Sequence, residues 1–125
     1  IITRETSTTV HPADISTTRT EYTLEALTKA LNNQDAVVCV VGPGGVPLQK
    51  TFIDAAEATG VQRFIIDDFG WGPDARGFPE FDAIHAIRRE GWDHAAKKAK
   101  ENRKFTWTGL TTGNPIDWVS QIAYF

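Results

Sequence analysis

The sequence predicts an α/β fold, a Rossmann-like doubly wound parallel sheet with helices on both faces. Short apolar segments alternate along the chain with segments whose apolar residues recur every three or four positions. The run Ala36–Val41 has no polar alternation, which is typical of a strand buried on both faces. Glycine or polar residues directly follow each apolar segment. Strand and helix signals that alternate in this way indicate parallel strands joined by helices.

The N-terminal half begins with a segment rich in serine and threonine. We expect a loop there, with a short strand near Ile15–Glu21. A helix should follow, with Thr23 as its N-cap and Asn32-Asn33 as its end. Its apolar stripe is Leu24, Leu27 and Leu31. The run Ala36–Val41 is then the next strand.

The C-terminal half repeats this alternation. A helix is predicted from the stripe Leu48, Phe52, Ala55 and Ala56, with Gly60 at its C-terminal end. Phe64–Ile66 is the next buried strand, and 105–108 the one after it. The longest helix should lie between these two strands. Its residues at steps of three and four are Phe81, Ile84, Arg88, Trp92, Ala95 and Ala99.

Bulk properties limit the class of protein. The 125 residues fit one domain, with a net charge of −3 and no apolar run long enough to cross a bilayer. We therefore expect neither a nucleic-acid partner nor a membrane partner, and we expect a cytoplasmic protein. Cys39, the one cysteine, is expected to be a small buried hydrophobe, and no cluster of residues predicts a metal site.

Ligands of doubly wound sheets bind beyond the carboxyl ends of the strands. The segments to inspect are therefore Thr3-Arg4, Gly42–Gly45, Asp67–Gly70 and Gly113–Pro115. The glycine-rich turn does not match either phosphate-binding pattern. Pro47 stands where G-x-G-x-x-G needs glycine, and the ATPase pattern fails as well. An ordinary strand-to-helix turn is favoured over a ligand contact there.

Three charged residues in or near these segments are candidates for a functional role: Asp67, Asp68 and Arg88. Asp67 and Asp68 are adjacent, so in an extended strand end their side chains should point to opposite sides. They cannot then act as a paired acid and base. Arg88 falls within an apolar helical stripe, where an arginine must either reach the protein edge or pair with an anion or a polar ligand.

In this order, the segments resemble the NmrA-like and isoflavone-reductase-like family, an atypical branch of the short-chain dehydrogenase superfamily. The resemblance covers about residues 1–118 and is closest to fungal members. It is carried by Gln34–Val38, Leu48–Ala56, Gly60–Ile65, Phe69-Gly70 and Thr106–Gly109.

The resemblance implies an NADP(H)-binding domain. Arg4 stands where the family reads the 2′-phosphate, and a planar guanidinium suits that contact. The implied cofactor-binding residues are Thr3, Arg4, Val41, Gly42, Pro43, Asp67, Asp68, Phe69, Asn114 and Pro115. Arg88 stands at the position of the family's catalytic lysine and is the candidate catalytic residue. Arginine is a poor proton donor at neutral pH, which leaves catalysis open.

The resemblance also implies that residues 1–125 form a partial domain. Ile1-Ile2 match the family's second strand, so the first strand–helix unit with its glycine-rich turn is expected to lie outside this chain, as is the C-terminal substrate region. That turn holds the cofactor's pyrophosphate, so the chain alone is expected to bind NADP weakly or not at all. The leading hypothesis is a reductase-like protein that transfers hydride to a small aromatic or carbonyl substrate. The alternative is a non-catalytic regulator of the NmrA type that senses the dinucleotide and binds a protein partner.

Overall fold

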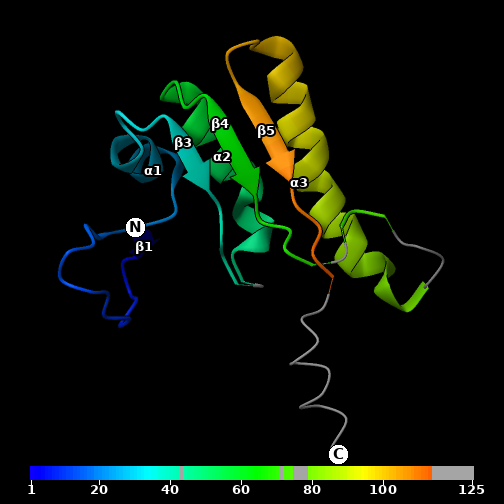
Figure 1. The fold of residues 1–125 in the computed structure, drawn as a ribbon. Helices are drawn as coiled ribbons and strands as arrows, with labels where there is room; N and C mark the ends of the chain where they lie inside the picture. The colour runs from blue at the N-terminus through cyan, green and yellow to red at the C-terminus, as the bar shows by residue number, and fades with distance from the viewer. Residues whose placement is uncertain (43, 71, 75–78, 114–125) are drawn as a thin grey trace, which may run out of the picture.

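The computed structural model describes residues 1–42, 44–70, 72–74 and 79–113. Five short strands lie in two parallel sheets, with three α-helices beside them (Figure 1). The strands are β1 (Ile2–Arg4), β2 (Thr18–Thr20), β3 (Ala36–Val38), β4 (Arg63–Ile66) and β5 (Thr106–Gly109). The helices are α1 (Leu24–Ala30), α2 (Gln49–Ala58) and α3 (Asp82–Glu101), with short 3-10 turns η1 (Val46–Leu48) and η2 (Pro79–Phe81).

The strands do not form one continuous sheet. β1 pairs with β2, and β3, β4 and β5 form a second sheet in that order, every pair being parallel. In the second sheet Val37, Phe64 and Trp107 lie in one row across the three strands. Parallel pairing brings the carboxyl ends of β3, β4 and β5 to the same edge. This confirms the predicted parallel α/β class.

The helices begin and end where local chemistry predicts. Thr23 caps α1, its Oγ1 accepting a hydrogen bond from the Ala26 N–H at 3.3 Å. Asn33 after α1 and Gly60 after α2 have φ values of 61° and 82°. Both residue types tolerate this left-handed conformation, so the chain can reverse there into the next strand.

The core lies between the three-stranded sheet and the helices. Phe64 and Ile66 of β4 are fully buried, as are Ile53, Ala55 and Ala56 of α2 and Ala95 of α3. Val37 and Trp107 pack against this cluster from the neighbouring strands. One face of the sheet is therefore covered by helices.

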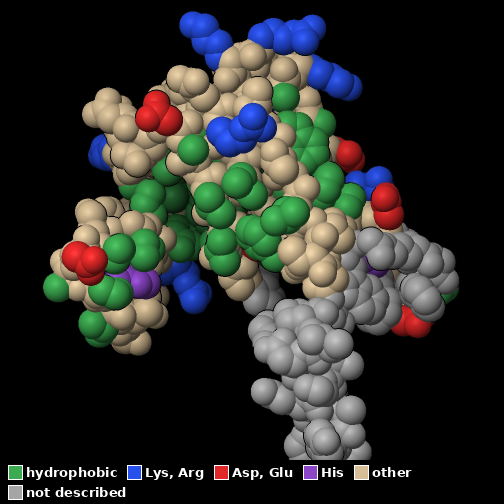
Figure 2. Space-filling view, viewed as in Figure 1, with side chains coloured by type: hydrophobic (Ala, Val, Ile, Leu, Met, Phe, Trp, Pro, Cys, Tyr) green, Lys and Arg blue, Asp and Glu red, His purple; other side chains and the backbone are tan. Residues whose placement is uncertain are grey.

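The opposite face corrects one expectation. Val38 is 58 % exposed and Val40 is 70 % exposed, so the segment 36–41 is not buried on both faces in the described part of the chain. The physical reason is alternation: Val37 and Cys39 point to the helical layer, and their neighbours point away from it. The described helices α2 and α3 cover the face to which Val37 and Cys39 point. Figure 2 shows hydrophobic side chains gathered over the open face.

Candidate functional site

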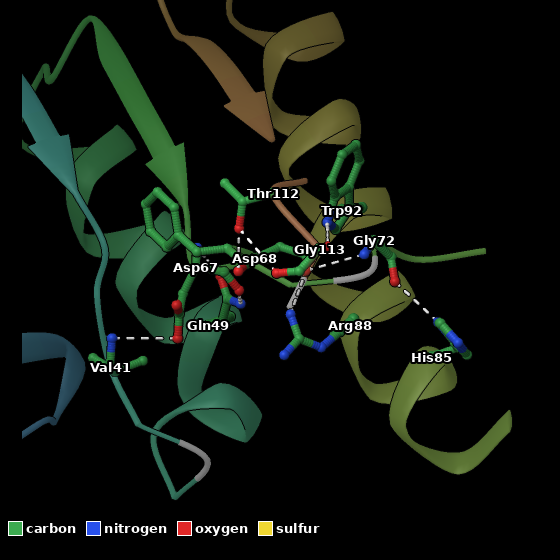
Figure 3. Close-up of polar contacts among 11 residues, drawn as sticks. Val41, Gln49, Asp67, Asp68, Gly72, His85, Arg88, Trp92, Thr112 and Gly113 are labelled. Carbon is green, nitrogen blue, oxygen red and sulfur yellow. Dashed lines mark hydrogen bonds and ion pairs between the residues drawn. The ribbon is translucent and has the colours of Figure 1, made fainter. Parts of the chain in front are cut away.

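The candidate site lies at the carboxyl ends of β3 and β4, against the first turns of α2 and the middle of α3 (Figure 3). Two adjacent carboxylates, Asp67 and Asp68, follow β4 directly. Asp67 is 9 % exposed and Asp68 is fully buried. Their side chains point to opposite sides, one toward Val41 and one toward α3, as the sequence predicted.

Asp67 joins the end of β4 to the segment after β3. Its Oδ2 accepts a hydrogen bond from the Val41 N–H at 3.2 Å. The buried Gln49 side chain holds its backbone, donating from Nε2 to the Asp67 carbonyl at 2.8 Å and accepting from the Asp67 N–H at 3.3 Å. Burial raises the pKa of Asp67, and the Val41 N–H and Arg88 oppose that rise. These three hydrogen bonds, one with Val41 and two with Gln49, fix Asp67 between the ends of β3 and β4.

Asp68 accepts hydrogen bonds from residues of α3 and from the loop that follows β4. Arg88 Nη1 forms an ion pair with Oδ1, Trp92 Nε1 donates to Oδ2 at 3.0 Å, and the Gly72 N–H donates to Oδ1 at 3.3 Å. A fully buried carboxylate is stable only with such partners. The Arg88 side chain is 24 % exposed, so the pair lies at the boundary of the protein interior.

Further contacts hold the loop that follows β4. His85 Nδ1 lies 3.0 Å from the Gly72 carbonyl, which places His85 and Arg88 on the face of α3 that contacts this loop. From the segment after β5, Thr112 Oγ1 donates to the Phe69 carbonyl at 2.5 Å, and the Gly113 N–H donates to the Gly70 carbonyl at 2.8 Å. The loop is therefore anchored by α3 on one side and by the segment after β5 on the other.

Two glycines permit close approach at this site. A Cβ on Gly70 would lie 3.4 Å from an Arg88 guanidinium nitrogen. A Cβ on Gly109 would lie 2.2 Å from the Trp92 ring, which also meets Trp107 edge-on at 5.2 Å between ring centroids. The Trp92 ring can reach Asp68 only because β5 carries no side chain at Gly109.

The structure brings together only part of the predicted set. One group lies together at the carboxyl ends of β3 and β4, a region that we call the rim: Val41, Asp67, Asp68, Phe69 and Arg88. Thr3 and Arg4 lie on β1, which belongs to the other sheet. Gly42 follows Val41 and is exposed. Three further predicted residues, Pro43, Asn114 and Pro115, lie outside the described residues.

Sequence reasoning missed Gln49, Trp92 and Thr112 as parts of the rim. Trp92 stood in the predicted apolar stripe, and its spacing of four from Arg88 was the available signal, since residues four apart share a helix face. Gln49 entered as part of the segment Leu48–Ala56, which carries the family resemblance. Nothing in its neighbourhood signalled that a buried amide would hold the Asp67 backbone.

Several features suit a dinucleotide. The Arg4 side chain is exposed at the carboxyl end of β1, where an anion can reach it. The Oγ1 of Thr3 is buried and has no hydrogen-bond partner among the described residues. A Cβ on Gly42 or Gly44, in the turn after β3, would meet no described residue other than its chain neighbours within 4 Å. Within the described ranges, no three His, Cys, Asp or Glu side chains are grouped to hold a metal ion.

Parallel strands whose carboxyl ends carry a polar rim, with helices joining them, define the class of nucleotide-binding α/β proteins. A model of the NAD(P)H-binding family matches residues 3–122, and the chain belongs to that family. None of the helices in the described ranges is long and apolar enough to cross a membrane.

The relatives include fungal oxidoreductases. The chain is 61 % identical over 118 residues to the oxidoreductase poxI of Penicillium oxalicum, covering 94 % of this chain and 38 % of that protein. It is 32 % identical over 119 residues to the oxidoreductase aprR of Aspergillus flavus, covering 90 % and 38 %. The chain thus spans less than half the length of these relatives.

Solved structures share the fold. AtPrR2 with NADP+ and (+)pinoresinol superposes with a TM-score of 0.64 at 19 % identity, over 76 % of this chain and 32 % of that one. A putative NADH-flavin reductase from Streptococcus pneumoniae gives 0.60 at 20 % identity, over 88 % and 57 %. At these identities the likeness establishes the Rossmann-like fold.

Proposed function

We propose that this chain is part of an NADP(H)-dependent reductase of the NmrA-like and isoflavone-reductase-like type, cytoplasmic, acting on a small aromatic or carbonyl substrate. The observation that carries the proposal is the fixed rim at the carboxyl ends of β3 and β4, where Asp67 joins the two strand ends. That edge is where α/β sheets bind dinucleotides. The relatives named as oxidoreductases support the same class.

The candidate residues of this chain contact different parts of the cofactor. Arg4 binds the 2′-phosphate, and Thr3 precedes it on β1. Val41 and Gly42 line the adenosine side. The loop that begins at Asp67-Asp68-Phe69 approaches the nicotinamide. Pyrophosphate is typically bound at a helix N-terminus behind a glycine-rich turn.

When bound, the nicotinamide supplies the hydride, and the protein orients and encloses it. The described residues suit the role of orienting and enclosing the nicotinamide. Gln49 fixes the Asp67 backbone, and Thr112 and Gly113 hold Phe69 and Gly70. Arg88 uses one of its five N–H donors in the ion pair with Asp68, so its guanidinium can still contact a ribose or a substrate oxygen.

The test is NADPH oxidation by a protein of the relatives' length that contains this chain. A panel of aromatic carbonyl compounds would be assayed at 340 nm, with cofactor affinity measured separately by NADPH fluorescence. We expect turnover of at least one class of compound. Cofactor binding without any turnover would contradict the enzymatic part of the proposal and leave the binding part standing.

The ion pair between Arg88 and Asp68 supports a second candidate function, a non-catalytic regulator that senses the dinucleotide and binds a protein partner. Arginine is a poor general acid or base, and this one is held in an ion pair with a buried carboxylate. Arg88→Lys discriminates between the two functions. A large gain in turnover in the variant would indicate a natural sensor, whereas a loss would indicate that the arginine itself serves the reaction.

A further inference from the structure

The connection between β1 and β2 contains no helix. Parallel strands are normally joined by a crossover of about a dozen or more residues, which usually forms a helix. Here residues 5–17 make the connection, and none of them belongs to a helix or a strand (Figure 1). The connection begins directly after Arg4, the last residue of β1. Its conformation therefore depends on contacts other than the hydrogen bonds of a helix.

The Arg19 side chain of β2 supplies two of these contacts. Its Nε donates a hydrogen bond to the Ser7 carbonyl at 3.0 Å, and its Nη2 donates to the Thr9 carbonyl, also at 3.0 Å. A guanidinium holds its N–H donors in a rigid plane, so two such bonds fix the orientation of the segment as well as its position. Within the segment the Thr9 N–H donates to Ser7 Oγ at 3.3 Å. Arg19 therefore anchors the first part of the connection to β2.

Two backbone hydrogen bonds extend this anchor to Arg4. The Ser7 N–H donates to the Arg4 carbonyl at 2.9 Å, which closes a four-residue turn. The Glu5 N–H donates to the Thr20 carbonyl of β2, also at 2.9 Å. The turn that begins at Arg4 is thus held at Glu5 by β2 and at Ser7 by Arg19. Without the Arg19 side chain, the Ser7 end would be released while the pairing of β1 with β2 remained.

Strand geometry separates the side chains of Arg19 and Arg4. Arg19 is paired with Thr3, and Arg4 is paired with Thr20. Paired residues of neighbouring strands project to the same face of a sheet, and consecutive residues of one strand project to opposite faces. The side chains of Arg4 and Arg19 therefore project to opposite faces of the two-stranded sheet. An effect of Arg19 on an anion bound by Arg4 would accordingly pass through the turn between them.

We propose that Arg19 is a positioning residue for recognition of the 2′-phosphate of NADP(H), because it holds the turn at Arg4 in place before the cofactor binds. This inference rests on the proposed function, in which Arg4 contacts that phosphate. A preorganised segment loses less conformational freedom on binding than a loose one, so preorganisation raises affinity. The affinity for NADPH should therefore depend on Arg19. The affinity for NADH, which has no 2′-phosphate, should not.

The test is the affinity for NADPH and for NADH, measured by fluorescence titration on a protein of the relatives' length. The proteins compared are the natural sequence, Arg19→Met, Arg4→Ala and the double variant. We expect Arg19→Met to lower the ratio of NADPH to NADH affinity by about three- to tenfold, the cost of ordering a loosened segment, with NADH affinity unchanged. In the Arg4→Ala background, Arg19→Met should lower the ratio no further, because it acts through Arg4.

Two control variants separate positioning from charge. Arg19→Gln removes the charge but keeps an N–H donor near the place of Nε, so its ratio should lie between those of Arg19→Met and the natural sequence. Arg103→Met makes the same change in net charge at an exposed position after α3 and should leave the ratio unchanged. Amide hydrogen exchange followed by mass spectrometry should be faster in residues 5–9 of Arg19→Met than in the natural sequence, without cofactor. Because Arg19 is exposed, we expect this variant to fold, which circular dichroism checks.

Four outcomes would overturn the inference, and they differ in what they say of the proposed function. An equal loss of NADPH and NADH affinity in Arg19→Met would indicate a general structural role. Equal ratios for Arg19→Gln and Arg19→Met would assign the effect to charge, and a full effect of Arg19→Met in the Arg4→Ala background would make Arg19 independent of Arg4. These three results leave the proposed function standing. A ratio that Arg4→Ala itself leaves unchanged would remove the proposed phosphate contact, and the inference with it.

Discussion

The buried ion pair between Asp68 and Arg88 gives the sharpest test of how the loop after β4 is held. Asp68→Ala removes the acceptor of three hydrogen bonds, from Arg88, Trp92 and the Gly72 N–H. The guanidinium and the indole N–H then lose their partner. Because Asp68 is fully buried, water can replace the carboxylate only if the surrounding residues rearrange.

The structure sets the size of the effect. Breaking a buried pair costs about 3–5 kcal/mol, and the 24 % exposure of the Arg88 side chain lets its charge turn toward water, so we expect the lower end, about 3 kcal/mol. Arg88→Met should cost about the same, because it leaves the carboxylate with two neutral donors. The double variant should cost about 3–4 kcal/mol rather than the sum, so the coupling energy is about 2–3 kcal/mol.

The assay is urea unfolding followed by tryptophan fluorescence and by circular dichroism. The matched control is the exposed pair of Arg89 and Asp74, whose atoms lie 2.8 Å apart with side chains 52 % and 77 % exposed. The corresponding cycle with Arg89→Met and Asp74→Ala should give less than about 0.5 kcal/mol of coupling, and less still in high salt. Additive effects of the Asp68 and Arg88 variants would refute the claim that this pair holds the loop.

Three other predictions concern single residues. Gly109→Ala should destabilise the fold by about 1–3 kcal/mol, because the new Cβ would lie 2.2 Å from the Trp92 ring. Gly42→Ala should destabilise it far less, because its new Cβ would meet nothing within 4 Å. Equal urea midpoints for the two variants would contradict this. Cys39 is buried, and burial raises the pKa of its thiol to about 12. Its reaction with an aromatic disulfide at pH 8 should therefore be about a thousandfold slower than that of an exposed cysteine. A rate near that of glutathione would contradict this. The raised pKa of Asp67 means that the folded state holds its proton more tightly than the unfolded state, so its contribution to stability is present at low pH and is lost as the pH rises past the folded pKa. The unfolding free energy of the natural chain should therefore fall relative to Asp67→Asn between about pH 3 and pH 7, and a rising difference would disprove the sign.

Much of the fold could be predicted from local signals. The stripe Leu24, Leu27 and Leu31 with a Thr23 cap predicted α1, and the longest periodic segment predicted α3. The opposite directions of Asp67 and Asp68 followed from strand geometry alone. These features depend on residues near one another in the sequence, so the pattern carries the information.

The rest depends on contacts between distant segments. Arg88 could be recognised as an arginine in need of a partner, but the partner lies 20 residues away and is set by how α3 packs on β5 and α2. Gln49 holds Asp67 across 18 residues, and no periodicity signals such a contact. The exposure of Val38 was missed because an apolar run without alternation cannot show which of its faces is covered.

The most direct test of the proposed function is the ratio of NADPH to NADH affinity in a protein of the relatives' length, measured for the natural sequence and for Arg4→Ala. Arg63→Ala is the matched control, because Arg63 is exposed at the amino end of β4, at the opposite edge of the sheet from the rim. The account predicts a preference for NADPH that Arg4→Ala lowers by about 10- to 100-fold, the worth of hydrogen bonds to a charged group, and that Arg63→Ala leaves unchanged. An affinity ratio that Arg4→Ala does not alter would contradict it.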